Sequence, residues 1–436
     1  MLVVVGAAAL HAANGPGAPG VIDAAFTKFF EGHTPLQAAR AAANIIRSGA
    51  SFDEALTRLK RGRAYSSNVK RGVVRFSRGA GGDTFFYDVV VPASYDPARR
   101  YQVRVQLHGG VGGRETSEPR GPGSVAPLVS DTDQICILPY GWMDAPWWTD
   151  RQLDNLRAIL DTVKRTYNID ENRVVLTGIS DGATAVYYFA MRDTTPFASF
   201  LPLNGFIMVL ANPSTRAEGD LFPNNLLNKP FFVINGGADP LYPARYVTPY
   251  IEHLQDNGAV VEYRPQETAG HNTAWWPDER DGFETFVREH PREPYPAWLS
   301  WESAGERSTN RAHWLVIDRL MSKRDGKSMY PDADEFDDPE VQAPSPRLIS
   351  HMGQYGRVDL ERAGNTITAT TRGVAAFTVL LSPDVVDFTQ PVKVLVNGDV
   401  AFQGRVQASV ATLLKWAARD NDRTMLFGAE LHVQVK

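Results

Sequence analysis

The chain has 436 residues, of which 43% are hydrophobic and 22% are charged, and its formal net charge is −5. This is an ordinary globular composition, so it excludes a disordered, collagen-like or coiled-coil chain. Lysine and arginine are scattered along the sequence, and no basic stripe indicates a nucleic-acid partner. A length above that of one average domain predicts two domains.

The N-terminus has an apolar stretch at residues 2–10, followed by a Gly/Pro-rich spacer at 14–20. This pattern resembles the apolar region and cleavage zone of a signal peptide, but the basic residues that usually come first are missing. We expect residues 1–20 to be either a signal-peptide remnant or a flexible terminus. We also expect a secreted or periplasmic protein, with the cytoplasm as the alternative. No other stretch has the roughly 18 to 20 apolar residues of a membrane span.

Residues 21–62 have a helical pattern, and we assign residues 21–70 to a helical arm. Thr34-Pro35 is typical of an N-cap and first helical position, and Ser51 with Glu54 forms the signature of a capping box. We expect a small helical arm in front of the main domain.

Strand-like and helical segments alternate from Val73 to about residue 264. The first two apolar runs predict antiparallel strands, and the alternation after them predicts a mostly parallel sheet with helices on both faces. We assign residues 71–291 to this α/β domain. Eight apolar runs mark the expected strands: 73–76, 85–91, 103–107, 135–138, 174–176, 200–203, 231–234 and 260–263.

The pattern changes after Pro291, where prolines and tryptophans precede a series of short β-like runs. We expect residues 292–436 to form a small β-rich accessory domain with one helix near 410–417. Asn397-Gly398 lies between two of these runs and is a strong signal for a two-residue hairpin. The acidic, proline-containing stretch 322–348 matches no calcium-loop spacing, and we expect a solvated loop there.

The sequence Gly178-Ile179-Ser180-Asp181-Gly182 follows an apolar run and precedes a helical pattern. A nucleophilic serine needs a sharp strand-to-helix turn that lifts its hydroxyl clear of the sheet, and flanking glycines relieve the crowding at such a turn. The helix N-terminus also favours developing negative charge. The same five-residue pattern also arises by chance in glycine-rich loops. Whether Ser180 is a nucleophile therefore depends on whether the sequence also supplies a histidine and a carboxylate in suitable positions.

A serine hydroxyl is a weak nucleophile unless an imidazole accepts its proton and a carboxylate orients the imidazole. Asp239 follows the run at 231–234, and His271 lies in the loop after the next run. Taken singly, Asp239 also fits a turn-stabilising aspartate before a proline, and His271 also fits a surface histidine. The order Ser, Asp, His, with each residue after its own strand, predicts a catalytic triad of Ser180, Asp239 and His271.

A glycine-rich loop, residues 107–113 (LHGGVGG), follows the third predicted strand. A backbone with few side chains approaches a substrate carbonyl closely and directs N–H groups at it. We expect an oxyanion hole formed by the N–H groups of Asp181 and Gly110, with Val111 as the alternate to Gly110. A flexible glycine turn is the other interpretation. His108 is expected to pack beneath the loop.

The ordered set LHGG, GISDG, GGADP and GHNTAWW resembles α/β-hydrolase-fold esterases, in particular the polyhydroxybutyrate depolymerase and feruloyl esterase-like group. The resemblance covers about residues 73–290. It implies an α/β-hydrolase fold, with a mostly parallel eight-stranded sheet flanked by helices. It also implies cleavage of a small-molecule or polymeric carboxylic ester without a metal ion or organic cofactor. The helical arm and the β-rich domain lie outside the resemblance.

Tryptophans cluster beside the predicted site. Trp142 and Trp147 follow one strand, and Trp275 follows His271. Large apolar rings are typical walls of an acyl pocket, although each ring also fits core packing between loops. We predict that Trp142, Trp147 and Trp275 border the substrate.

Three functional hypotheses follow. The first is an esterase that works through an acyl-enzyme intermediate. The second keeps the triad in a serine peptidase similar to the prolyl-oligopeptidase group, but no β-propeller repeat precedes the catalytic segment. The third is a polymer-binding protein on a hydrolase scaffold. The presence of all three triad residue types argues against this hypothesis.

Overall fold

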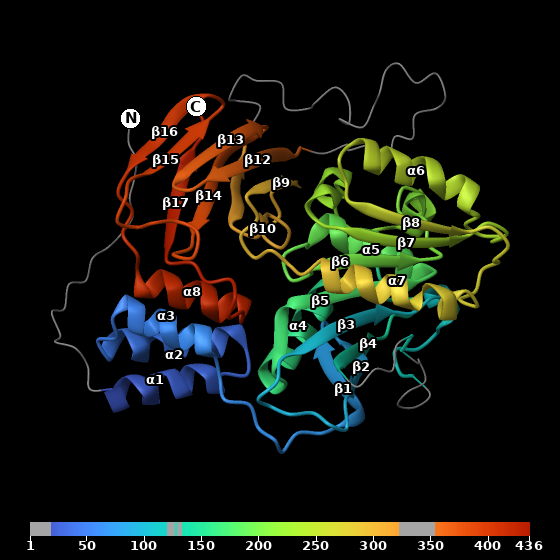
Figure 1. Ribbon diagram of the computed structural model, residues 1–436, viewed down its shortest axis with the longest axis horizontal. Helices are drawn as coiled ribbons and strands as arrows, with labels where there is room; N and C mark the ends of the chain where they lie inside the picture. The colour runs from blue at the N-terminus through green and yellow to red at the C-terminus, as the bar shows by residue number, and fades with distance from the viewer. Residues whose placement is uncertain (1–18, 120–126, 129–132, 322–353) are drawn as a thin grey trace.

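The computed structural model describes residues 19–119, 127–128, 133–321 and 354–436 (Figure 1). Residues 1–18 of the predicted signal-peptide remnant at 1–20 and the whole acidic loop at 322–348 lie outside the described residues, and both stay predictions. Within the described ranges, no helix combines the length and the apolar character that crossing a membrane requires.

The central element is an eight-stranded sheet with the order β1-β2-β4-β3-β5-β6-β7-β8. β1, β2 and β4 pair antiparallel, and every later neighbour pairs parallel. This topology, with its antiparallel start, confirms the predicted α/β-hydrolase fold. The strands are β1 (Gly72–Ala80), β2 (Asp83–Val91), β3 (Tyr101–Leu107), β4 (Gln134–Pro139), β5 (Ile169–Ile179), β6 (Ser199–Leu203), β7 (Phe231–Gly236) and β8 (Val261–Gln266).

Helices cover both faces of this sheet, which explains why its central strands are apolar throughout. In β5, Val174 and Leu176 belong to the core cluster on one face, whereas Val175 between them belongs to the cluster on the other face. The flanking helices are α4 (Asp150–Thr166), α5 (Asp181–Arg192), α6 (Ala244–Asp256) and α7 (Trp276–Glu289). Short 3-10 helices occur at η1 (Val111–Gly113), η2 (Ile207–Val209), η3 (Pro213–Thr215) and η4 (Pro223–Asn228).

The described strands from residue 298 onward form two packed sheets, here named the C-terminal sandwich. One sheet has the order β16-β15-β13-β12-β9 and the other β10-β11-β14-β17, and their inward side chains share one core. The predicted hairpin is confirmed, since Asn397 and Gly398 join β15 to β16 with φ of 51° and 89°. The strands are β9 (Trp298–Ser303), β10 (Arg311–Ala312), β11 (Leu315–Leu320), β12 (Gly356–Ala363), β13 (Thr366–Arg372), β14 (Val374–Leu381), β15 (Val392–Val396), β16 (Asp399–Gly404) and β17 (Ala429–Gln434).

The N-terminal helices α1 (Pro19–Glu31), α2 (Pro35–Arg47) and α3 (Phe52–Arg61) pack on α8 (Val410–Asp420) of the C-terminal part. Thr34 caps α2, and Ser51 with Glu54 forms the expected capping box of α3. Leu413 and Leu414 of α8 are fully buried in this four-helix cluster. The helices α1 to α3 therefore pack against a helix near the other end of the chain. Figure 1 shows α8 between these three helices and the sandwich.

Candidate active site

Ser180 lies in a sharp turn between β5 and α5, with φ 57° and ψ −120°. A side chain with a Cβ atom rarely adopts a positive φ, and such strain is typical of a nucleophile elbow. A Cβ atom on Gly178 would lie 2.1 Å from the carbonyl oxygen of Gly182, and one on Gly182 would lie 2.1 Å from that of Leu107. Both glycines are therefore required for the turn to form beside β3.

The structure brings the three predicted triad residues together. His271 Nε2 lies 2.8 Å from Ser180 Oγ, and His271 Nδ1 lies 2.7 Å from Asp239 Oδ2. A neutral imidazole that donates from Nδ1 to the carboxylate has an acceptor at Nε2 for the serine hydroxyl. The arrangement can therefore accept a proton from Ser180.

Asp239 is fixed by its own loop as well as by the histidine. Its Oδ1 accepts hydrogen bonds from the N–H groups of Leu241 at 2.8 Å and Tyr242 at 3.0 Å. Its side chain is fully buried, whereas that of His271 is 23% exposed. The carboxylate is therefore held on one edge by two donors and presents its other oxygen to the imidazole.

Close packing of two loops sets the distance between Asp239 and His271. A Cβ atom on Gly236 would lie 2.4 Å from the carbonyl oxygen of Ala269, and one on Gly237 would lie 2.3 Å from that of Glu267. The two glycines of the GGADP segment thus let the loop after β7 contact the loop after β8. This close approach explains why glycine, which has no Cβ atom, occupies both positions.

The glycine-rich loop passes directly over the elbow. A Cβ atom on Gly109 would lie 2.8 Å from Ser180 Cβ, and Gly110 has φ 67°. Among the described residues, the N–H of Gly110 makes no hydrogen bond, and Asp181 is the first residue of α5, whose N–H has no intrahelical acceptor. Gly110 and Asp181 therefore keep the two donors that an oxyanion hole needs beside Ser180.

The alternate donor, Val111, does not fit this role. Its N–H already donates to Asp181 Oδ2 at 2.8 Å, so it is not available to a substrate oxygen. The same contact ties the glycine-rich loop to the first turn of α5. The Asp181 side chain thus holds the glycine-rich loop in place, a contact that the sequence did not predict.

Asp181→Ala is expected to lower kcat about 10- to 100-fold with a smaller change in KM, because the loop that carries Gly110 loses its tether. Asp181→Asn retains an amide oxygen that can accept the Val111 N–H, and we expect its kcat to stay within about threefold of wild type. Steady-state kinetics of both variants on one ester checks this. Equal loss in the two variants would show that the charge of Asp181, rather than the tether, matters.

His108 supports the glycine-rich loop from below, as expected. Its Nδ1 lies 2.9 Å from the Gly109 carbonyl oxygen, its Nε2 accepts the N–H of Gly141 at 3.1 Å, and its own carbonyl accepts the indole N–H of Trp147 at 2.8 Å. Burial lowers the pKa of His108 to about 4. The ring is therefore neutral near pH 7 and makes one bond as donor and one as acceptor.

Stability should fall in acid because of this histidine. Between pH 6.5 and about 4 the His108 imidazole is protonated in the unfolded chain but stays neutral in the native protein. The free energy of unfolding therefore decreases as the pH falls through this range. The shift corresponds to about 3 kcal/mol for this group between pH 7 and pH 4. Denaturant titrations of wild type and His108→Gln at both pH values test it, since the variant lacks the group and should lose less stability. Identical pH dependence would contradict the assignment.

The three predicted substrate-binding tryptophans lie in the core. Trp142 is 4% exposed, Trp147 1% and Trp275 5%. Trp142 packs on Phe85, and Trp147 packs on the ring of His108. These rings leave almost no surface for a substrate, because the loops that carry them fold back onto the sheet. Core packing, the other interpretation of the cluster, fits them better.

A groove of about 720 Å³ opens beside the elbow instead. Its apolar side is formed by Val111, Met143, Pro146, Trp148 and Val209, and its charged side chains are Asp144, Arg151, Asp181, Arg216 and Glu218. Met143 is 50% exposed, although it is a large apolar residue. Trp148 directly follows Trp147 in the predicted tryptophan cluster, but no local signal in the sequence indicates Met143 or Arg216, which come from separate loops.

No family profile and no curated protein matches the chain. Among solved structures, a thermostable esterase is 20% identical with a TM-score of 0.39, over 50% of this chain and 63% of that chain. The apo form of Thermogutta terrifontis esterase 2 is 14% identical with a TM-score of 0.41, over 50% and 94%. The S-formylglutathione hydrolase FrmB from Staphylococcus aureus is 16% identical with a TM-score of 0.37, over 50% and 98%. The strand order of this chain, and not these likenesses, supports the α/β-hydrolase fold.

Proposed function

We propose that this chain is a serine hydrolase that cleaves carboxylic esters through an acyl-enzyme intermediate. The observation that carries the proposal is the unbroken chain of contacts from Asp239 through His271 to Ser180 at the end of β5. In this proposal Ser180 is the nucleophile, His271 the general base and Asp239 the group that orients the imidazole.

Acylation begins when Ser180 Oγ attacks the acyl carbon and its proton passes to His271 Nε2. The carbonyl oxygen becomes an oxyanion, which accepts hydrogen bonds from the N–H groups of Gly110 and Asp181. Asp239 stabilises the imidazolium that has formed. His271 then donates the proton to the departing alkoxide, so the alcohol leaves and the acyl group stays on Ser180.

Deacylation repeats these steps with water as the nucleophile. His271 removes a proton from the water as the oxygen attacks the acyl carbon, and the same two N–H groups hold the second oxyanion. The proton then returns to Ser180 Oγ as the acid is released. The reaction needs no group beyond the side chains and N–H groups named here.

The motifs place esters ahead of amides, since LHGG, GISDG, GGADP and GHNTAWW resemble the polyhydroxybutyrate depolymerase and feruloyl esterase-like group. The groove beside the elbow also suits a substrate with both apolar and polar parts. We therefore place hydroxybutyrate and feruloyl esters first among the candidate substrates.

The test combines active-site labelling with a substrate panel. A fluorophosphonate probe should label the wild type and not Ser180→Ala, and the wild type should turn over esters of varied acyl length faster than peptide anilides. Equal labelling of Ser180→Ala would remove Ser180 as the nucleophile. Faster turnover of anilides would make the protein a peptidase, and binding of polymers without turnover of any ester would favour the polymer-binding alternative.

A further inference from the structure

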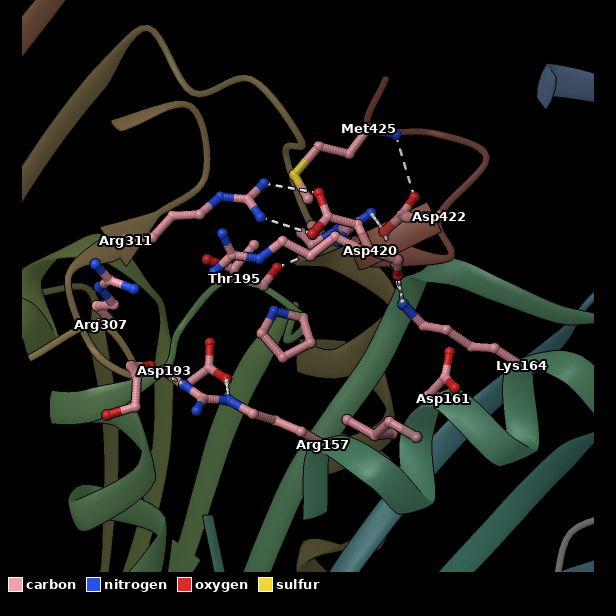
Figure 2. A pocket seen from close by; sticks show the side chains of 15 residues that line it. Arg157, Asp161, Lys164, Asp193, Thr195, Arg307, Arg311, Asp420, Asp422 and Met425 are labelled. Carbon is pink, nitrogen blue, oxygen red and sulfur yellow. Dashed lines mark hydrogen bonds and ion pairs between the residues drawn. The ribbon is translucent and has the colours of Figure 1, made fainter. Parts of the chain in front are cut away.

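A second cavity, of about 300 Å³, lies far from the elbow, between the α/β unit and the C-terminal part (Figure 2). Its walls include Asp193 and Thr195, which follow the end of α5 opposite to Ser180. Other walls come from α4, from the segment around Arg307 and from the end of α8. The cavity therefore opens at the amino edge of the sheet, whereas Ser180 lies at the carboxyl edge.

Positive charge exceeds negative charge in the lining of this cavity. Six cationic side chains line it, against four carboxylates. The cations are Arg157, Lys164, Arg292, Arg307, Arg311 and Arg419, and the carboxylates are Asp161, Asp193, Asp420 and Asp422. A concentration of like charge in a recess raises the local potential for a counter-ion.

Some of the cationic side chains form ion pairs with the carboxylates of the cavity. Arg311 forms a two-pronged pair with Asp420 at 2.6 and 2.7 Å, and Arg157 contacts Asp193 at 2.6 Å (Figure 2). The two other carboxylates are also engaged. Asp422 lies 2.8 Å from Arg292 and 3.8 Å from Lys164, and Asp161 pairs with Arg165 outside the cavity at 2.8 Å.

Two of the six cationic side chains, Arg307 and Arg419, have no carboxylate partner among the described residues. Within the described ranges, neither Arg307 nor Arg419 forms an ion pair or a side-chain hydrogen bond. Arg419 lies over the ring of Trp416 at 5.1 Å, and Arg311 lies over the same ring at 4.4 Å. Trp416 thus brings two guanidinium groups together, and in the part of the chain that the structure describes only that of Arg311 has a carboxylate partner.

We propose that this cavity is a binding site for a phosphate group, either inorganic phosphate or a phosphate monoester, with Arg307 and Arg419 as its principal ligands. Two unpaired guanidinium groups match the double negative charge of phosphate, and guanidinium is the side-chain group that best fits phosphate geometry. Thr195 and Ser308 also line the cavity. The Thr195 hydroxyl oxygen accepts the N–H of His313, which leaves its proton to donate, and a serine hydroxyl can also donate to a phosphate oxygen.

Bound phosphate would tie the two halves of the chain together. Arg307 and Arg419 come from the C-terminal part, whereas Thr195 and the paired Arg157 belong to the α/β unit. A ligand that binds only the folded chain raises the unfolding midpoint. Because this site and Ser180 lie at opposite edges of the sheet, the proposal does not depend on the ester chemistry.

Calorimetric titration and thermal unfolding of the full chain test the site, with inorganic phosphate and glycerol 2-phosphate as probes and chloride at matched ionic strength as the reference. We expect phosphate or the monoester to bind the wild type and raise its unfolding midpoint. The double variant R307A/R419A should bind at least about tenfold more weakly. Both arginines are exposed, so the variant should fold.

The control is R280A/R405A, which removes two exposed arginines outside the cavity and should bind like the wild type. Binding of both probes assigns a site for the phosphate group, and binding of the monoester alone assigns a phosphorylated compound. The proposal is overturned if neither probe binds the wild type, or if R307A/R419A binds as tightly as the control.

Discussion

Ser180→Ala is expected to lower kcat for ester hydrolysis about 10⁴- to 10⁶-fold. The substitution removes the proposed nucleophile while it leaves His271, Gly110 and Asp181 in place. Water must then attack the acyl carbon, so the rate that remains reflects the oxyanion donors and binding. Alanine meets the same strain at φ 57° as serine, and we expect little change in the unfolding midpoint. Single-turnover and steady-state kinetics with an activated ester measure the loss.

The matched control is Ser94→Ala, an exposed serine whose side chain makes no hydrogen bond in the described structure. It should keep wild-type kinetics. His271→Ala should lose nearly as much activity as Ser180→Ala, and the double variant should lose little more, because the two residues act as one unit. A Ser180→Ala enzyme within about tenfold of wild type would disprove the role of Ser180.

The sheet and the placement of Ser180, Asp239 and His271 could be predicted because local patterns encode them. Buried parallel strands must be apolar, and such runs at 174–176 and 231–234 stand out in the sequence. Each triad residue follows a strand at the edge where parallel strands end together. The order Ser, Asp, His along the chain, with each residue after its own strand, is therefore enough to predict that the three side chains meet.

Contacts between distant segments could not be predicted in this way. The hydrogen bond from Val111 N–H to Asp181 depends on how the glycine-rich loop approaches the start of α5, 70 residues further along the chain. Likewise, nothing local in the sequence of α1 to α3 indicates that they pack on α8 near the other end of the chain. The burial of Trp142 and Trp147 follows from the path of their loops, and an aromatic cluster is equally compatible with a pocket wall.

The cavity lined by Arg307 and Arg419 could not be predicted from the sequence either. Its charged side chains are spread from residue 157 to residue 422, with no motif and no basic run. Only the docking of the C-terminal part on the α/β unit collects them. A scattered distribution of arginine argues against an extended nucleic-acid surface, but it does not exclude a compact site for a small anion.

Asp239→Asn is expected to lower kcat/KM for esters about 10⁴-fold at neutral pH. Oδ1 accepts two N–H groups, from Leu241 and Tyr242, so the amide oxygen of asparagine should take that place and its NH₂ group should face His271 Nδ1. An NH₂ group there requires an acceptor, which forces the proton of the imidazole onto Nε2. That tautomer cannot accept the proton of Ser180, and the charge that stabilises the imidazolium is also lost.

The variant should fold like the wild type, since the two loop hydrogen bonds are kept. Measurement of kcat/KM, the rate of fluorophosphonate labelling and the unfolding midpoint separates a chemical defect from a structural one. Asp256→Asn, at an exposed aspartate in the last turn of α6, is the control for loss of one negative charge. If Asp239→Asn stayed within about tenfold of that control, the carboxylate would not be the group that fixes the tautomer, and the buried hydrogen bonds of Asp239 would serve only to hold the loop.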